Sequence, residues 1–432
     1  MPELPDLTSG PLAWLAVGVF VLAYALVIAE EFTHLRKSKP LIVAAGAIWL
    51  IVAIVWRQRG IPGTGTALRH NLLEYAELLL FLLAAMTYVN TLEERRVFDA
   101  LREYVISKRL SFRQAFWVTG AMAFFLSPLI DNLTTALVMG AIVVTMGRGN
   151  SAFIAPACIN IVVAANAGGA FSPFGDITTL MVWQKGMINF FGFFDLFVPS
   201  LVNWLIPALC MSFAVPSSLP SGAGEVVTVK RGGYAVILLF GLTIAMTVCG
   251  QQLAQLPPFV GMMTGLGLLQ LYGYRIRRRE LREASSNEPP FDVFVSMKNV
   301  EWDTLLFFYG VILCVGGLAA LGYLNVFSSL SYETLGPSIT NILMGVISAV
   351  IDNIPIMFAV LSLNPEMSQE QWLLVTLTAG VGGSLLSIGS AAGVALMGQA
   401  RGIYTFGSHL RWSWAVALGY AGSIAAHFLI NP

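Results

Sequence analysis

The sequence predicts an all-α polytopic membrane protein built from two inverted repeats, each with a re-entrant helical hairpin and a broken transmembrane helix. Three observations support this fold class: the composition, the recurrence of long apolar segments, and motifs that repeat in the same order in both halves. The 432 residues are 56% hydrophobic and 11% charged, whereas a soluble domain carries about 25% charged residues. Membrane lipid is therefore an expected partner of much of the surface.

Apolar segments that approach the ~20 residues of a bilayer-spanning helix recur along the chain. Examples are residues 11–29, 41–55, 72–89, 198–215, 234–250 and 412–430. A membrane β-barrel would show alternating segments of roughly ten residues instead, and the sequence has no such pattern. The spanning elements are therefore expected to be helices.

The distribution of charge predicts an orientation in a bacterial inner membrane. Basic residues cluster at 36–39, 95–113 and 275–282, and short cytoplasmic loops carry an excess of lysine and arginine. Placing these clusters inside puts the N-terminus on the periplasmic side, although the basic residues between 57 and 69 oppose that choice. The 24 basic and 24 acidic residues cancel, which argues against a nucleic-acid partner.

Three motifs occur twice. Ser127, Asp131 and Asn132 belong to an S-x-x-I-D-N motif that recurs in the second half of the chain with Ser348, Asp352 and Asn353. A glycine-rich motif at 168–176 recurs at 382–390, and an acidic residue followed by a leucine run, at Glu77, recurs at Asp303. Each repeat is thus expected to open with an acid at the start of a membrane helix.

The repeats suggest a division of the chain into three parts. Residues 1–215 contain the first repeat, with a hairpin at about 112–146 and a broken helix at about 152–190. Residues 216–302 connect the halves through loops and two helices. Residues 303–432 contain the second repeat, with a hairpin at about 337–363 and a broken helix at about 371–400. Inverted repeats in secondary transporters place the site near the bilayer midplane, between the halves.

Buried acids make the hairpin tips candidate cation sites. An aspartate at the centre of a membrane helix costs about 2.5 to 3.5 kcal/mol on insertion scales, so Asp131, Asp176 and Asp352 need a partner. Hard cations prefer oxygen ligands, which favours Na⁺ or Li⁺ bound by these three carboxylates. The neighbouring side chains that add polar groups are Asn132, Asn353, Ser127, Ser348, Asn166, Thr178, Ser172 and Ser387.

A buried carboxylate permits cation and proton exchange. Burial disfavours the charged form of a carboxyl group, and a bound cation favours it. Such a group therefore holds a proton or a metal ion but not both, and ion affinity depends on pH. Glu77, Asp303 and His70 are candidates for a proton path or a pH response, because histidine titrates near neutrality.

Structural roles compete with these functional ones. Asp131, Asp352 and Asp176 precede helix-forming segments, and aspartate is a preferred helix N-cap. Glu77 and Asp303 could simply reach interfacial water, and hydroxyl groups in membrane helices often bond to their own backbone. Capping by itself does not explain why Asp-Asn recurs in both halves.

The motifs S-P-L-I-D-N-L-T-T, N-A-G-G-A-F-S-P-F-G-D-I-T-T, E-W-D-T-L-L-F-F-Y-G and G-G-S-L-L-S-I-G-S-A-A-G-V-A-L-M-G resemble those of NhaD-type sodium/proton antiporters, from about His70 to Arg401. The resemblance implies a non-enzymatic carrier that exports Na⁺ or Li⁺ in exchange for H⁺, with no cofactor. Relatives in the same superfamily suggest a homodimer with an elevator-like movement.

Two other functions remain open at this stage. An ion-coupled carrier of carboxylates or arsenite belongs to the same superfamily, but the aspartates at both tips disfavour an anion. An intramembrane aspartyl hydrolase would need two carboxylates that share a water molecule, and repeated glycine-rich breaks add nothing to that chemistry.

Overall fold

The computed structural model describes residues 7–219, 227–283 and 290–431, and in these ranges the chain is helical without β-strands. The predicted all-α class is therefore confirmed. Eight of the described helical segments are long and apolar enough to cross a membrane. They are Pro11–Ile28, Ser38–Gln58, Thr64–Glu94, Ser151–Gly169, Phe190–Ser212, Gly233–Ala254, Trp302–Ala320 and Ser413–Ile430.

The chain forms two compact units that are interleaved along the sequence. Unit 1 comprises the described residues of 1–91, 235–335 and 358–365, and unit 2 those of 92–234, 336–357 and 366–432. Each unit is therefore assembled from three separate stretches of the chain.

Unit 1 contains the N-terminal helices and the helices that precede the second hairpin. Its core is α3 packed against α1 and α14, and the indole nitrogens of Trp49 and Trp56 donate to the carbonyls of Leu313 (2.8 Å) and Ala320 (3.1 Å). Its elements are α1 (Pro11–Ile28), α2 (Glu30–Thr33), α3 (Ser38–Gln58), most of α4 (Thr64–Glu94), most of α11 (Gly233–Ala254), α12 (Pro258–Glu283), α13 (Val293–Lys298), α14 (Trp302–Ala320), α15 (Tyr323–Ser328), the π-helical turn η2 (Ser329–Glu333) and the end of α17 (Asn353–Leu363).

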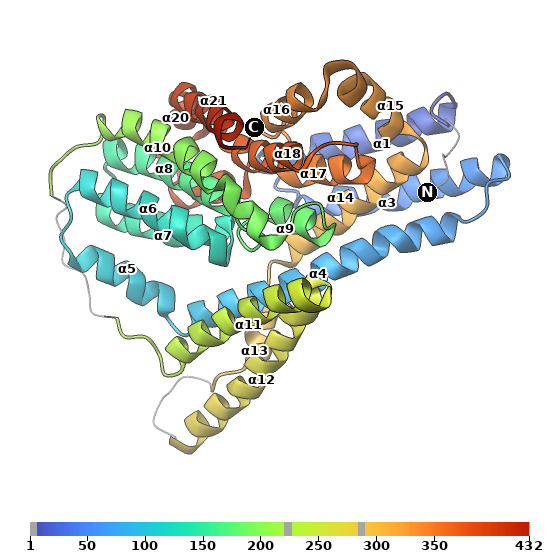
Figure 1. The fold of residues 1–432 in the computed structure, drawn as a ribbon. Coiled ribbons are helices and arrows are strands. Elements are labelled where there is room, and N and C mark those ends of the chain that lie inside the picture. The colour runs from blue at the N-terminus through green and yellow to red at the C-terminus, as the bar shows by residue number, and fades with distance from the viewer. Residues whose placement is uncertain (1–6, 220–226, 284–289, 432) are drawn as a thin grey trace. The chain divides into compact units, whose positions relative to one another are not determined.

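Unit 2 contains both hairpin tips and both glycine-rich breaks. Figure 1 shows α6, α7 and α8 beside one another, and these three helices pack pairwise. The elements of unit 2 are α5 (Val97–Ser107), α6 (Phe112–Ile130), α7 (Asn132–Gly147), α8 (Ser151–Gly169), α9 (Ile177–Gln184), the 3₁₀ turn η1 (Phe190–Leu196), α10 (Phe197–Ser212), α16 (Pro337–Ile347), the start of α17 (Asn353–Leu363), α18 (Gln369–Gly382), α19 (Ala391–Gln399), α20 (Phe406–Leu410) and α21 (Ser413–Ile430).

Local sequence explains where the hairpin helices begin and end. Ser111 and Gln114 form a capping box at the start of α6, which satisfies amide donors that a helix start otherwise leaves open. Asp131 ends α6 with a positive φ of 70° and begins α7 as its N-cap. In the second hairpin, Pro337 occupies the first turn of α16, where its missing N–H costs nothing.

The two hairpins contact their broken helices in the same way. The Ser127 hydroxyl donates to the Ala165 carbonyl at 2.7 Å, and the Ser348 hydroxyl donates to the Ala379 carbonyl at 2.9 Å. The two serines hold the same place in their S-x-x-I-D-N motifs, and the two acceptors lie equally far before their glycine-rich motifs. The packing of hairpin on broken helix thus recurs, while the inverted direction of the two repeats stays a prediction.

One sequence expectation is wrong. Helix α4 begins at Thr64, so Glu77 lies near its middle and not at its start, because the polar stretch before residue 72 is also helical. Asp303 does lie in the first turn of α14, as expected.

Candidate ion site

The candidate site lies in unit 2, where two hairpin tips meet a helix break. Asn132 begins α7 and Asn353 begins α17, while Asp176 stands in the break between α8 and α9. These residues are 44 and 177 positions from Asp176, so only the tertiary fold brings them together.

The carboxylate of Asp176 is the centre of this site. The side-chain amide of Asn132 donates to Asp176 Oδ2 at 3.0 Å, and that of Asn353 donates to the same oxygen at 3.1 Å. The backbone N–H and the hydroxyl of Thr178 donate to Oδ1 at 2.9 and 3.0 Å. Asp176 is buried, and within the described part of the chain no lysine or arginine donates to it.

Asn166 extends the network on one side. Its Oδ1 accepts from the amide of Asn132 at 3.1 Å, which therefore bridges Asn166 and Asp176. The Asn166 Nδ2 is buried and has no hydrogen-bond partner among the described residues. Both hairpin tips are thus joined to the helix break through neutral amides.

Asp131 caps α7 as the structural interpretation anticipated. Its Oδ1 accepts from the backbone N–H of Thr134 at 2.8 Å, and its Oδ2 accepts from the Thr134 hydroxyl at 2.9 Å. Its φ of 70° with ψ of 157° is a conformation that side chains other than glycine rarely adopt. Capping accounts for the hydrogen bonds, but it does not account for a strained aspartate at this position.

Asp352 is the corresponding residue of the second tip. Its Oδ1 accepts a long bond of 3.4 Å from the N–H of Ile354, and it lies close enough to Asp176 for their charges to repel. Two carboxylates within electrostatic reach of one another are more stable when one of them is neutralised by a proton or a cation.

The hydroxyl groups divide into two kinds. Those of Ser127, Ser348 and Ser172 donate to backbone carbonyls and so hold the hairpins and breaks together. The hydroxyl of Ser387, in contrast, is buried and has no partner in the described ranges. A buried polar atom without a partner is costly, so this hydroxyl differs from the other three in having no structural bond to satisfy it.

Thr179 is a residue of the site that sequence reasoning missed. Its hydroxyl donates to the carbonyls of Asp176 (2.6 Å) and Ser172 (2.8 Å), closing the break on which Asp176 stands. Its position directly after Thr178 in the glycine-rich motif was the available signal.

The three residues assigned to a proton path belong to unit 1. His70 Nε2 lies 3.1 Å from Glu74 Oε1, and Asp303 accepts a 2.5 Å hydrogen bond from the hydroxyl of Ser38. Burial raises the pKa of the nearby Glu30 above its ordinary value, Lys37 opposes that shift and Asp303 adds to it. Glu77 lies on the same helix α4 as the His70–Glu74 pair, three residues after Glu74.

The donor set fits a hard cation as cargo. Aspartate, asparagine and threonine side chains offer oxygen atoms, which alkali and alkaline-earth ions prefer. The described residues contain no group of three or more His, Cys, Asp or Glu side chains that could hold a metal ion.

A membrane-spanning helical bundle with paired hairpins and paired helix breaks is the architecture of a secondary transporter. Comparison with known families agrees, because residues 24–380 match the family model described as citrate transporter. The chain is 56% identical to the Na(+)/H(+) antiporter NhaD of Alkalimonas amylolytica, over 99% of this chain and 92% of that protein.

Two further relatives extend this comparison. The NhaD antiporter of Vibrio cholerae is 54% identical over 99% of this chain and 93% of its own length. The sodium/proton antiporter 1 of Arabidopsis thaliana is 31% identical over 96% of this chain and 72% of its own length. The chain belongs to the NhaD-type sodium/proton antiporter family, and it is a multi-pass membrane transporter and not an enzyme.

Proposed function

We propose that this chain exchanges Na⁺ or Li⁺ for H⁺ at the site around Asp176, with Asp131 and Asp352 as the flanking carboxylates. The observation that carries the proposal is the convergence of both hairpin tips on one buried carboxylate, through the amides of Asn132 and Asn353. No cofactor is needed, because the ions themselves are the cargo.

The amides explain how one site serves two ions. Each amide now points its nitrogen at Asp176, which suits a charged carboxylate without a cation. Turning an amide over replaces the N–H donors by an oxygen, so a cation at Asp176 recruits Oδ1 of Asn132 and Asn353 as ligands. A proton on Asp176 neutralises the carboxylate and removes the attraction for the cation.

A carboxylate carrier is the second candidate, because the matching family model is described as citrate transporter. The charges at the site disfavour it. Three aspartates lie at the tips and the break, and none of the described donors to Asp176 is basic. An anionic substrate would need buried arginine or lysine to offset its desolvation.

The distribution of basic residues supports a proposal for the membrane and the orientation of the chain. We place the chain in the bacterial inner membrane with a periplasmic N-terminus, because the basic segments 36–39, 95–113 and 275–282 then face the cytoplasm. We also propose that the protein forms a homodimer and binds no nucleic acid. Cross-linking in native membranes tests the first, and accessibility of the segment 95–113 to a protease from one side tests the orientation.

The exchange itself is tested in reconstituted, acid-loaded vesicles. External Na⁺ or Li⁺ is expected to raise the internal pH, whereas citrate is expected to leave it unchanged. If bound ion and proton compete, the apparent KM for Na⁺ rises about tenfold for each pH unit below the pKa of the binding carboxylate, for one competing proton. A KM that stays constant while the maximal rate falls would instead separate the proton from the cation site.

The strained backbone of Asp131 gives a prediction that separates stability from transport. Asp131→Gly removes the strain, worth roughly 1 to 3 kcal/mol, while glycine as an N-cap costs only a few tenths of a kcal/mol. Asp131→Asn keeps both the cap and the strain. We therefore expect the glycine variant to unfold at a higher temperature than the asparagine variant in detergent, and both to lose cation-driven proton movement. Equal unfolding temperatures would show that position 131 is unstrained.

A further inference from the structure

Unit 2 contains a cavity that the exchange site does not account for. It has a volume of about 220 Å³ and lies among the end of α4, α5, α7 and the end of α19. Its charged lining residues are Glu93, Asp99 and Arg102, and Gln399 adds an amide. Leu137, Val138 and Ala141 of α7 form its apolar wall.

The cavity continues the face of α7 that carries the hydrogen-bond partner of Asp131. One face of this helix holds Thr134, Leu137, Val138 and Ala141, which are three or four positions apart. All four are half-buried. Thr134 bonds to Asp131 through both its backbone and its hydroxyl. Because a helix rises 1.5 Å per residue, Val138 lies only about 6 Å along α7 from Thr134.

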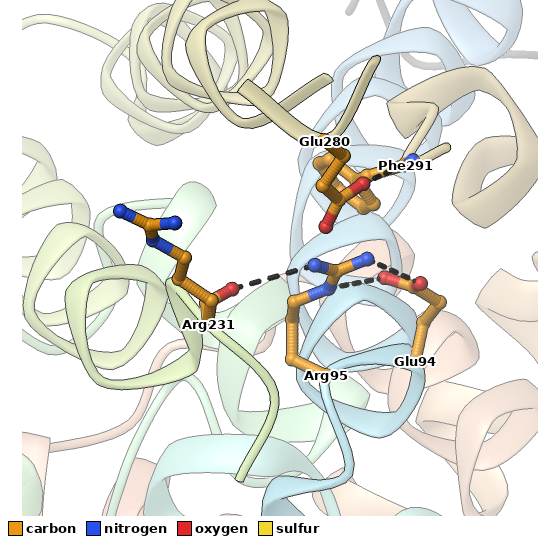
Figure 2. A network of polar contacts seen from close by, with 5 residues as sticks. All are labelled: Glu94, Arg95, Arg231, Glu280 and Phe291. Carbon is orange, nitrogen blue, oxygen red and sulfur yellow. Dashed lines mark hydrogen bonds and ion pairs between the residues drawn. The ribbon is translucent and has the colours of Figure 1, made fainter. Parts of the chain in front are cut away.

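The charged side chains that line the cavity, two acids and one arginine, have a net charge of −1, which favours a cation. Arg102 pairs with Asp99 at 3.1 Å, whereas the Glu93 carboxylate has no ion-pair partner among the described residues. Figure 2 shows contacts of the nearby Arg95 with other residues. The Arg95 guanidinium bonds to Glu94 at 2.6 and 2.5 Å and to the Arg231 carbonyl at 3.4 Å.

Gln399 supplies an independent sign that a polar guest fits here. Its Nε2 donates to the Leu137 carbonyl at 3.2 Å, which ties α19 to α7. Its Oε1 is shielded from solvent and has no hydrogen-bond partner in the described ranges. An oxygen that is left unsatisfied at the wall of a cavity can be satisfied by water or by a hydrated cation.

We propose that this cavity is the aqueous vestibule through which the transported alkali cation reaches Asp131, and that Glu93 raises the local concentration of that cation. The inference rests on the proposed function, and it adds a route and a source of electrostatic attraction that the site alone does not provide. Fixed charge in a cleft with low-dielectric walls accelerates the arrival of an oppositely charged substrate.

The test is a charge series on the vestibule in reconstituted protein. At low ionic strength, Glu93→Gln is expected to raise the apparent KM for Na⁺ about twofold to fivefold, and Arg102→Gln to lower it by a similar factor. The maximal rate stays unchanged, because neither residue contacts the exchange site. Both changes in KM are expected to disappear at high ionic strength. They are expected only when Na⁺ is added on the membrane side that the segment 95–113 faces, which the proposed orientation makes the cytoplasmic side. Glu366→Gln, an acid of unit 2 outside the cavity, is the control and leaves KM unaltered.

A second measurement keeps the vestibule testable without transport. Ala141→Cys is expected to react faster with a cationic than with an anionic methanethiosulfonate, relative to the parent protein with its four native cysteines, and Glu93→Gln reduces that preference. Equal KM values across the charge series, or a cysteine at 141 that shows no charge preference, would overturn the vestibule. Failure of the wild type to exchange any cation would refute the proposed function. The charge preference of labelling at position 141 would then show by itself whether the cavity attracts cations.

Discussion

Asp176→Asn is expected to abolish cation-driven proton movement while the protein still inserts and folds. The carboxylate accepts hydrogen bonds from the amides at both hairpin tips. A hydrogen bond to a charged group is worth roughly 1.5 to 3 kcal/mol and one between neutral groups about 0.5 to 1.5 kcal/mol, so weakening two of them costs about 2 to 3 kcal/mol of the closed arrangement. That corresponds to a decrease in rate on the order of 10 to 10², and the lost attraction for the cation removes the remaining exchange.

The matched control is Asp195→Asn, which changes an exposed aspartate of the same unit. We expect it to exchange Na⁺ for H⁺ at the wild-type rate. Asp176→Glu is a useful intermediate, because it keeps the charge and displaces the oxygens by one methylene. Substantial exchange by Asp176→Asn would remove Asp176 from the transport mechanism and leave Asp131 and Asp352 as the ion-binding carboxylates.

The sequence identifies three candidate acids and predicts that Asp131 and Asp352 line one cavity and compete for proton and cation, with Asp176 nearby. The pattern does not show which of the three accepts hydrogen bonds from both hairpin tips. That distinction depends on the amides of Asn132 and Asn353, which lie in different halves of the chain and meet at one carboxylate. A motif fixes the chemistry of a tip, whereas the orientation of each side chain depends on packing between distant segments.

Helix lengths show a related limit. The hairpins could be predicted because an Asp-Asn motif interrupts each apolar stretch, and in the first hairpin Asp131 stands between the two helices. The start of α4 could not, because its first turns are polar and hydropathy does not separate a polar helix from a loop. The interleaving of the two units has no local signal at all, since the chain passes from one unit to the other within α4, α11 and α17.

The motifs that recur in the sequence, in contrast, do make equivalent contacts in the structure. A Cβ atom added at Gly168 would overlap the carbonyl of Phe124, and one added at Gly382 would overlap the carbonyl of Gly345. The two glycines open their glycine-rich motifs, and the two carbonyls lie equally far before the serines of the S-x-x-I-D-N motifs. Each broken helix therefore approaches its hairpin so closely that only glycine fits.

Gly382→Ala is consequently expected to be among the most destabilising single methyl additions in unit 2. The added atom meets the oxygen, carbon and Cα of Gly345, and backbone cannot rotate away as a flexible side chain can. Overpacking of this kind costs about 1 to 3 kcal/mol, and more where the backbone must shift. The measurement is the unfolding temperature in detergent, followed by size-exclusion chromatography after heating.

The control for this variant is Gly398→Ala on α19, where an added Cβ has no neighbour within 4 Å. Replacing a helical glycine by alanine without a clash stabilises a protein by roughly 0.4 to 1 kcal/mol, so the two variants should shift the unfolding temperature in opposite directions. Gly168→Ala is expected to behave like Gly382→Ala, because the two positions make equivalent contacts. If Gly382→Ala were neutral, α16 and α18 would be free to separate, and the close approach would not be what holds the second tip beside Asp176.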